Sequence, residues 1–420
     1  MMIEGTRSQL EQVASNFVRW LSGYGETSWD FQTFYAGPVG RRAKRLYYQH
    51  KYLGTLAVSP IIFCEAFIPS TRRFFFERQR FPIADAHFAM GFAYLFGVSG
   101  KETDYERAVH FLEVLLQTRC PSRTGYGWGY PFDWEGIYGT SKHATPLITT
   151  LPYVYEAFAQ IYALDRQERW LQVMRAIAEH AYHDYRDIAT SPGAAMCAYT
   201  PEADDLGTVV NASAYRASLL ARAATDLGDE RYLAPAMRNM RFVIEAQNDD
   251  GSWYYSVDGK RPFIDHFHTC FVLKGLAKVH SVMPSPDCWH AIERGVSYYV
   301  SQLFDERGLP RPFAKAPRLI VYRRELYDYA ECINLATLLR GRFPQLDRRV
   351  ATVIDDLLNR WVKTDGSFRS RHLHLGWDNV PMHRWAQAQT FRSLCARIAD
   401  DVNREQAARS EQLTDHGIPA

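Results

Sequence analysis

The sequence lacks the features that mark several common protein classes. Its seven cysteines are scattered and never spaced as CxxC, which excludes a disulfide framework and a zinc knuckle. No run approaches the roughly 18 uncharged apolar residues that a membrane-spanning helix needs. The start, MMIEGTRSQLEQ, has no apolar core of a secretory signal. We therefore expect a cytoplasmic protein without an integral membrane segment, and leave peripheral membrane association open.

Charge of one sign is scarce as well. The chain carries 49 basic and 47 acidic residues, and no long block of one sign, which argues against a nucleic-acid partner. The nearest basic cluster is Arg41, Arg42, Lys44 and Arg45, which we interpret as a solvated helix face, with an anionic substrate or lipid as the alternative. No nucleotide-binding loop, dinucleotide fingerprint or EF-hand loop occurs, so neither a cofactor nor a metal is expected. The absence of a DDxxD motif disfavours an isoprenoid transferase or cyclase.

Aromatic residues, in contrast, are abundant. Phe, Trp and Tyr make up 14% of the 420 residues, with 25 tyrosines and 10 tryptophans. Such side chains fill cores, and they also line sugar-binding clefts, because the apolar face of a pyranose stacks on a ring.

An internal repeat organises the chain. Each copy opens with a polar or aromatic cluster that leads into a small-residue-rich segment, passes a turn containing Asp, and enters an amphipathic segment. The openings lie near Ala86, Thr149, Asn211, Asp265, Asp328 and Met382, at gaps of 63, 62, 54, 63 and 54 residues. Six units of helix-hairpin length predict an all-α protein whose apolar first helices form an inner ring and whose amphipathic second helices form an outer ring, an (α/α)6 toroid.

The ends of the chain do not follow the repeat. We expect residues 1–85 to form an N-terminal helix and a largely irregular rim segment with one more helix, residues 86–400 to form the toroid, and residues 401–420 to form a polar tail. The last unit lacks a second helix of its own, so a helix from Ser8 to Leu21 is predicted to close the ring. Turn-rich segments such as GYGWGYPFDW (125–134) and NDDGSWYY (248–255) connect outer helices to inner ones, and therefore collect at one rim.

Five strings carry a resemblance to a known family: WGYPFDW (128–134), YTPEADDLGTVVNAS (199–213), DGSWYY (250–255), IDHFHTCF (264–271) and MHRWAQA (382–388). In their order and spacing they resemble bacterial proteins of exopolysaccharide and lipopolysaccharide gene clusters, which are placed in the six-hairpin glycosidase-like superfamily of α/α toroids. The resemblance spans roughly residues 60–398. It implies a carbohydrate-handling protein, since the superfamily includes glycoside hydrolases, uronate-sugar lyases and sugar epimerases.

The starts of the inner helices supply the candidate catalytic residues. Helix N-termini present unpaired N–H groups and a positive dipole end to the cavity. Asp265 and His268, three residues apart, would share a helix face, so the carboxylate can tune the imidazole as a general acid or base; the competing interpretation is a helix cap beside a structural histidine. The other catalytic candidates are Asp133, Asp328, Tyr199 and Tyr254.

The substrate-binding candidates are aromatic or hydrogen-bonding residues of the same openings and rim loops. They are Trp128, Tyr130, Trp134, Asn211, Tyr215, Trp253, His266, Tyr327, Arg384, Trp385 and Gln387. Arg384 would hold a uronate carboxylate or a phosphate, unless it forms a buried salt bridge with a neighbouring helix.

Three functions remain open at this point. The first is an epimerase or lyase of cell-surface polysaccharide biosynthesis that acts on an acidic glycan or lipid-linked saccharide, with Arg384 holding the carboxylate. The second is a glycoside hydrolase that uses two of Asp133, Asp265 and Asp328. The third is a glycan-binding component without catalytic activity. The substrate and the oligomeric state do not follow from the sequence.

Overall fold

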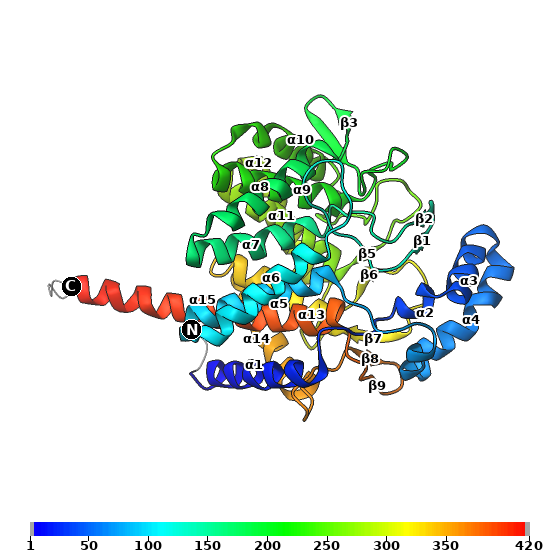
Figure 1. Cartoon of the computed structure of the whole chain (residues 1–420), viewed down its shortest axis with the longest axis horizontal. Coiled ribbons are helices and arrows are strands. Elements are labelled where there is room, and N and C mark those ends of the chain that lie inside the picture. Colours follow the sequence, from blue (N-terminus) through cyan, green and yellow to red (C-terminus); the bar gives the residue numbers. More distant parts are fainter. Residues whose placement is uncertain (1–3, 416–420) are drawn as a thin grey trace.

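The protein forms a closed double ring of helices (Figure 1). The structure is a computed structural model that describes residues 4–415. In the inner ring of helices, each helix contacts the next and the last contacts the first. In ring order these helices are α5 (Pro82–Ser99), α7 (Leu151–Asp165), α9 (Val210–Leu227), α11 (His266–Val282), α13 (Leu326–Leu338) and α15 (Ala388–Asp415). The predicted (α/α)6 toroid is confirmed.

Small residues let the inner helices approach one another closely. A Cβ atom added at Gly275 of α11 would lie 2.9 Å from the Ala214 side chain of α9, and one added at Gly91 of α5 would lie 2.4 Å from the Phe391 ring of α15. Interiors at this packing density leave no room for an extra methyl group. The small-residue bias seen in the repeat is thus what allows the ring to close.

The outer ring consists of one amphipathic helix for each inner helix. These are α6 (Glu102–Gln117), α8 (Glu168–His183), α10 (Leu233–Glu245), α12 (Pro286–Gln302), α14 (Pro344–Asp356) and, beside α15, the N-terminal helix α1 (Glu4–Tyr24). Phe17 of α1 is buried against Phe391 of α15, with ring centroids 5.0 Å apart. The N-terminal helix therefore closes the ring, as predicted.

The turns within the hairpins are short and capped. Gly228 ends α9 in a left-handed conformation, with φ of 64°, and Asp229 then accepts a hydrogen bond from the Arg231 N–H in the short helix η2 (Glu230–Tyr232). This sharp reversal sends the chain back along the outside of the ring.

The opposite end of the ring carries the long connections. Nine short strands lie there: β1 (Trp134–Gly136), β2 (Gly139–Ser141), β3 (Asp187–Ser191), β4 (Ala194–Cys197), β5 (Ile264–Asp265), β6 (Phe313–Lys315), β7 (Tyr322–Glu325), β8 (Arg371–Leu373) and β9 (Trp377–Asp378). They form antiparallel pairs β1–β2, β3–β4 and β5–β6 and a three-stranded sheet β7–β8–β9. Helices α11 and α13 start directly after β5 and β7, so this rim holds the starts of inner helices, as the repeat predicted.

The segment between α1 and α5 differs from the expectation of one helix. It contains α2 (Thr33–Ala36), α3 (Pro38–Gln49) and α4 (Lys51–Phe67), followed by the short helix η1 (Pro69–Phe74). Helices α3 and α4 form a hairpin that projects from the rim (Figure 1). The sequence pattern missed α4 because apolar residues lie on both its packed and its exposed face, which removes the alternation that marks an amphipathic helix.

The C-terminal segment also differs from a trailing tail. Two short π-helices, η3 (Leu357–Trp361) and η4 (His383–Gln387), flank the last rim loops. Helix α15 follows η4 and continues to Asp415. Arg340 pairs with Asp400 and Asp401 at 2.5 Å, which fixes the polar part of α15 against the end of α13. Residues 416–420 of the predicted tail lie outside the described residues.

Candidate active site

Asp265 and His268 form a hydrogen-bonded pair at the start of α11. One carboxylate oxygen of Asp265 accepts the His268 backbone N–H at 2.9 Å, and the other accepts the imidazole Nδ1–H at 2.6 Å. The same carboxylate therefore caps the helix and orients the imidazole. Asp265 is buried, whereas the His268 side chain keeps 22% of its surface exposed. Because Nδ1 is engaged, Nε2 is the atom left to meet a substrate.

A small cavity lies beside this pair. It measures about 10 Å³ and is lined by Val210, Asn211, Trp253, Tyr254, Tyr255, Asp265, His268, Thr269 and Val272. This volume holds about one water molecule. A cavity of this volume is too small to enclose a saccharide.

Aromatic rings pack around His268. Phe267 lies 4.4 Å from the His268 ring and 5.0 Å from Tyr327, and Tyr327 lies 5.0 Å from Trp385, as measured between centroids. Tyr255 meets His268 edge-on at 4.6 Å. Phe267 and Trp385 are half-buried, so they present ring surface on which a sugar can stack. The predicted residues Tyr327 and Trp385 are thus linked to His268 through Phe267.

Asp328 is a buried carboxyl group on α13. It is 1% exposed, and neither oxygen has a hydrogen-bond partner among the described residues. Burial raises its pKa well above the ordinary value, and the nearby charges of Glu325 and Asp265 raise it further. A raised pKa favours the protonated form of the carboxyl group, which is the form a general acid needs.

The floor beneath these groups carries ionisable residues. Glu331, one turn beyond Asp328, pairs with Lys274 of α11, so the two carboxyl groups of α13 do not act as a free pair. Tyr153 of α7 and the predicted residue Tyr215 of α9 share a hydrogen bond of 2.7 Å, and Lys274 lies 3.5 Å from the Tyr153 hydroxyl. One turn deeper, Lys278 and Arg392 both pair with Glu156.

Several of these floor residues were not predicted from the sequence. Lys274, Glu156, Arg392, Tyr153 and the buried His87 were hidden among the apolar residues of the inner helices. Their signal is the spacing: Lys274 and Lys278, four residues apart, share one face of a helix that should otherwise be apolar. Burial, with smaller effects from Arg392 and Lys274, lowers the pKa of His87 well below its ordinary value, so this histidine is neutral.

Arg384 is committed to an ion pair. Its Nε lies 2.8 Å and its Nη2 2.5 Å from Asp30, and both side chains are buried. The guanidinium also stacks over the Tyr130 ring, 4.6 Å from its centroid. The pair ties residue 30 of the N-terminal segment to the rim, and it is the buried salt bridge that stood as the alternative for Arg384.

Asp133 and Trp134 contact the N-terminal hairpin. Asp133 accepts the His143 backbone N–H at 2.9 Å and pairs with Arg41 of α3; the backbone hydrogen bond contributes most to lowering the Asp133 pKa. Lys44 of α3 lies 2.9 Å above the Trp134 ring, and Arg45 pairs with Glu135 at 2.7 Å. Most of the basic cluster that we interpreted as a solvated face therefore binds the rim loop.

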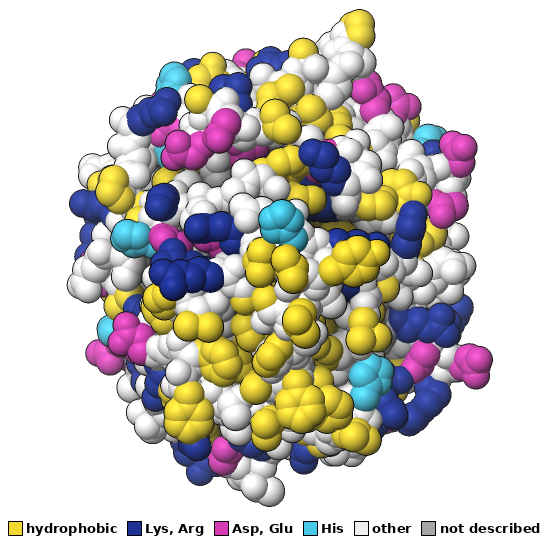
Figure 2. All heavy atoms as spheres, turned by 90° about the vertical axis from the view of Figure 1, so that its right-hand side faces the viewer, with side chains coloured by type: hydrophobic (Ala, Val, Ile, Leu, Met, Phe, Trp, Pro, Cys, Tyr) yellow, Lys and Arg dark blue, Asp and Glu magenta, His cyan; other side chains and the backbone are white. Residues whose placement is uncertain are grey.

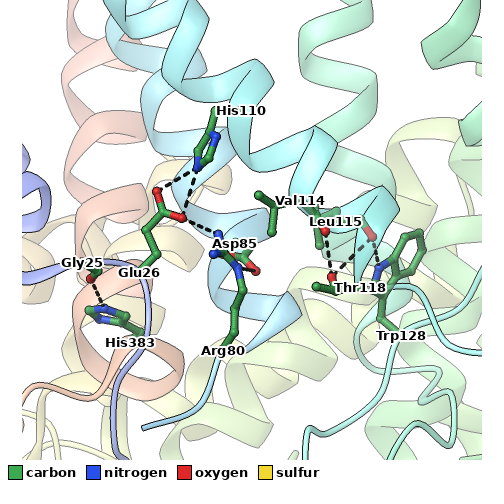
Figure 3. Close-up of polar contacts among 10 residues, drawn as sticks. All are labelled: Gly25, Glu26, Arg80, Asp85, His110, Val114, Leu115, Thr118, Trp128 and His383. Carbon is green, nitrogen blue, oxygen red and sulfur yellow. Dashed lines mark hydrogen bonds and ion pairs between the residues drawn. The ribbon is translucent and has the colours of Figure 1, made fainter.

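Four predicted binding residues form hydrogen bonds that support the scaffold. Trp128 is fully buried and donates its indole N–H to the Leu115 carbonyl at 2.7 Å (Figure 3), and Trp253 donates likewise to the Val243 carbonyl. Gln387 binds both the N–H and the carbonyl of Phe368. His266 bonds Tyr299 at 2.6 Å, and burial lowers its pKa to about 3. The two tryptophans bond carbonyls in the last turns of α6 and α10, where backbone oxygens lack helical partners.

The remaining predicted residues lie around the cavity or near it. Tyr254 lines the cavity, and Lys315 of β6 lies 4.6 Å above its ring. Asn211 is buried there, with its carbonyl oxygen unpaired among the described residues. The Tyr199 hydroxyl accepts a hydrogen bond from Thr149, and burial raises the Tyr199 pKa well above 10.

Figure 3 shows how the N-terminal segment is held at the rim. The His383 Nε2 atom bonds the Gly25 carbonyl at 2.9 Å, and Arg80 bridges Glu26 and Asp85 of α5. These contacts lie apart from the His268 cluster and serve to close the ring.

Neither a protein-family model nor a curated protein sequence matches this chain. Solved structures do. The chain is similar to a cellobiose 2-epimerase from Bacillus thermoamylovorans B4167, with a TM-score of 0.60 at 9% identity over 77% of this chain and 88% of that one. It is similar to a D-mannose isomerase, with a TM-score of 0.57 at 12% identity over 77% and 88%. The unsaturated glucuronyl hydrolase from Bacillus sp. GL1 follows, with a TM-score of 0.53 at 13% identity over 74% and 85%. The chain thus has the α/α toroid fold found in enzymes that act on carbohydrates.

Proposed function

We propose that this protein is a carbohydrate-active enzyme that moves a proton on a saccharide, as an epimerase does. The observation that carries the proposal is the Asp265–His268 pair, whose half-buried imidazole faces aromatic rings at the rim of the toroid. The likeness of the fold to a sugar epimerase and a sugar isomerase supports it.

The proposed chemistry uses two kinds of group, the Asp265–His268 pair and the buried carboxyl group of Asp328. Asp265 accepts the Nδ1–H of His268 and fixes its tautomer, so Nε2 can take a proton from a sugar carbon. Asp328, held neutral by burial, can donate a proton to the oxygen or carbon on which negative charge develops. Phe267, Tyr327 and Trp385 offer ring faces that orient the sugar.

Glycoside hydrolysis fits less well. It needs one protonated and one ionised carboxyl group on opposite sides of the bond. Asp133 is paired with Arg41, and both oxygens of Asp265 are engaged by His268, so Asp328 alone of the three predicted carboxyl groups is uncommitted. Proton transfer by a histidine therefore describes the site better.

An acidic substrate and a biosynthetic role remain parts of the proposal. β-Elimination on a uronate would use the same base and acid, although the expected clamp, Arg384, is held by Asp30. The resemblance to proteins of exopolysaccharide and lipopolysaccharide gene clusters supports a role in cell-surface polysaccharide biosynthesis in the cytoplasm.

Isotope exchange tests the proposal. The purified protein is incubated in heavy water with cellobiose, mannose or a glucuronate-containing disaccharide, and deuterium in the sugar is followed by mass spectrometry. We expect exchange with at least one of these sugars, and a loss of about 100-fold or more in His268→Gln, as is typical when a general base is removed. An absorbing unsaturated product would identify the lyase form of the reaction.

His290→Gln is the matched control. His290 pairs with Glu293, also three residues apart on a helix, but its side chain is 72% exposed on the outer ring. It should exchange at the wild-type rate. Full exchange in His268→Gln would refute the assignment of the base, and saccharide binding without exchange in the wild type would point to a non-catalytic glycan-binding protein.

A further inference from the structure

Helix α4 exposes a continuous apolar face. Tyr52, Leu53, Leu56, Phe63 and Phe67 recur at intervals of one, three, four or seven residues, so they share one side of the helix. Tyr52 is 86% exposed and Leu56 72% exposed. A soluble surface helix normally places polar residues there. A stripe of this length is unusual on a surface that meets only water.

Charge is almost absent from this exposed face. Lys51, at the start of α4, is its one exposed charged residue. The other charged residue, Glu65, is buried and pairs with Arg371 of β8 at 2.8 Å. The opposite face of α4 packs inward through Val58 and Ile61, so the helix is fully anchored while its apolar outer face stays bare.

The apolar surface extends beyond α4 onto the rim. Leu319 in the β6–β7 loop is 85% exposed, and Leu375 in the β8–β9 turn is 72% exposed. Figure 2, which faces the right-hand side of Figure 1, shows hydrophobic side chains gathered over the lower half of this end of the molecule, with Lys and Arg around them. The hairpin projects outward at this end of the molecule (Figure 1).

The same segment concentrates positive charge. Residues 33–76 contain seven Lys and Arg and one acidic residue, the buried Glu65, in a chain whose net charge is only +2. Arg41, Arg45 and Arg72 bind acidic groups of the rim. Arg42, Lys51 and Arg73 are exposed and form no ion pair within residues 4–415.

We infer that the α3–α4 hairpin docks the protein on the surface of an anionic phospholipid bilayer. Exposed large apolar side chains on one helix face, flanked by unpaired cations, match the requirements of an interfacial helix that lies in the membrane surface. None of the described helices is long and apolar enough to span a bilayer, so the contact is peripheral. Positive charge at the edge of an apolar face favours anionic lipid headgroups over a neutral surface.

Docking would turn the mouth of the toroid toward the membrane. The hairpin is pinned to both sides of the rim, by Arg45–Glu135 on β1 and by Glu65–Arg371 on β8. If the proposed function holds, the saccharide is then best supplied on a lipid carrier, because its sugar would lie next to the mouth. The docking itself does not depend on that activity.

Sedimentation with vesicles tests the inference. The full chain is mixed with vesicles of phosphatidylcholine alone or of phosphatidylcholine with 30% phosphatidylglycerol, and the bound fraction is measured at low and high salt. We expect strong binding to the anionic vesicles, weaker binding to the neutral ones, and loss of binding with salt. The double variant Leu56→Glu/Phe63→Glu should lower the partition by roughly tenfold or more.

Leu338→Glu is the matched control, since Leu338 is 43% exposed but lies at the far end of α13. It should bind vesicles like the wild type, and thermal unfolding should show that all variants are folded. Arg42→Glu/Lys51→Glu, which leaves the apolar face intact, should weaken binding to anionic vesicles alone. Absence of vesicle binding by the wild type would overturn the inference. So would a wild-type dimer that the Leu56→Glu/Phe63→Glu variant converts to a monomer without any change in vesicle binding.

Discussion

Asp328 is buried without a hydrogen-bond partner among the described residues. Burying a carboxyl group in this way lowers the stability of the folded state. The folded-state pKa of Asp328 lies above the value of about 3.9 expected when unfolded. Ionisation therefore costs native stability, and the cost grows as the pH rises above about 4. A group retained at such a cost is a candidate for function.

Asp328→Asn removes the ionisation while keeping the shape. We expect its thermal midpoint to exceed that of the wild type at pH 8, and the difference to shrink toward pH 4, where both chains carry a neutral group. Its exchange activity should be lost, because an amide cannot act as the acid. Thermal unfolding at pH 4, 6 and 8 measures the first effect. Asp287→Asn, at the exposed start of α12, should be neutral or slightly destabilising; a variant at position 328 that is less stable than the wild type at pH 8 would contradict the assignment.

The predictable part of the site is local. The three-residue spacing of Asp265 and His268 at the start of a helix could be recognised from the sequence, since the geometry of a capped helix start places them together. Arg384 could not be assigned, because its partner Asp30 lies more than 350 positions away and belongs to no repeat. Trp128 and Trp253 were predicted to stack on a sugar. How deeply their side chains are buried depends on how the rim turns fold back toward α6 and α10.

Among the helices, α1 has the role that is hardest to see from its position in the chain. It is the first helix, yet it serves as the outer helix of the sixth hairpin. The turn at Gly366 presses directly on it: Gly366 has φ of +91°, and a Cβ atom there would lie 2.6 Å from the Asn16 carbonyl oxygen. Gly251 meets the Arg294 carbonyl of α12 in the same way. This shared contact shows that α1 occupies the position of a repeat helix.

Gly366→Ala tests that contact. Gly376 has a similar φ of +79° but nothing within 4 Å of its Cβ position, so Gly376→Ala is the control for backbone strain alone. Both substitutions should cost about 1 kcal/mol for the left-handed conformation. Gly366→Ala should lose a further 1–3 kcal/mol or so from the collision with α1. Urea unfolding measures the difference, and equal losses in the two variants would show that α1 does not pack as described.

The helical hairpins of the ring were predictable because each repeats the same contrast between an apolar inner and an amphipathic outer helix. Helix α4 was missed because its exposed face is as apolar as its packed face. A local sequence pattern predicts a helix when polar residues alternate with apolar ones at helical spacing. The exposed face of α4 is apolar, so α4 lacks that signal.

At the scale of the whole molecule, the ring gathers residues that are far apart in the chain. Phe267 of α11, Tyr327 of α13 and Trp385 of η4, just before α15, form one series of ring contacts because α11, α13 and α15 are neighbours. The count and order of repeats predicted this closure. The rim segments that narrow the mouth depend on long-range ion pairs such as Arg72–Asp378, which no repeat encodes.

The proposed function requires that a saccharide binds against His268. Nuclear magnetic resonance of the protein with ¹⁵N-labelled histidine, titrated with cellobiose, mannose and a glucuronate-containing disaccharide, tests it without requiring turnover. We expect the side-chain signals of His268 to shift on binding while those of His290 stay in place. Binding of a saccharide that leaves the His268 signals unmoved would contradict it.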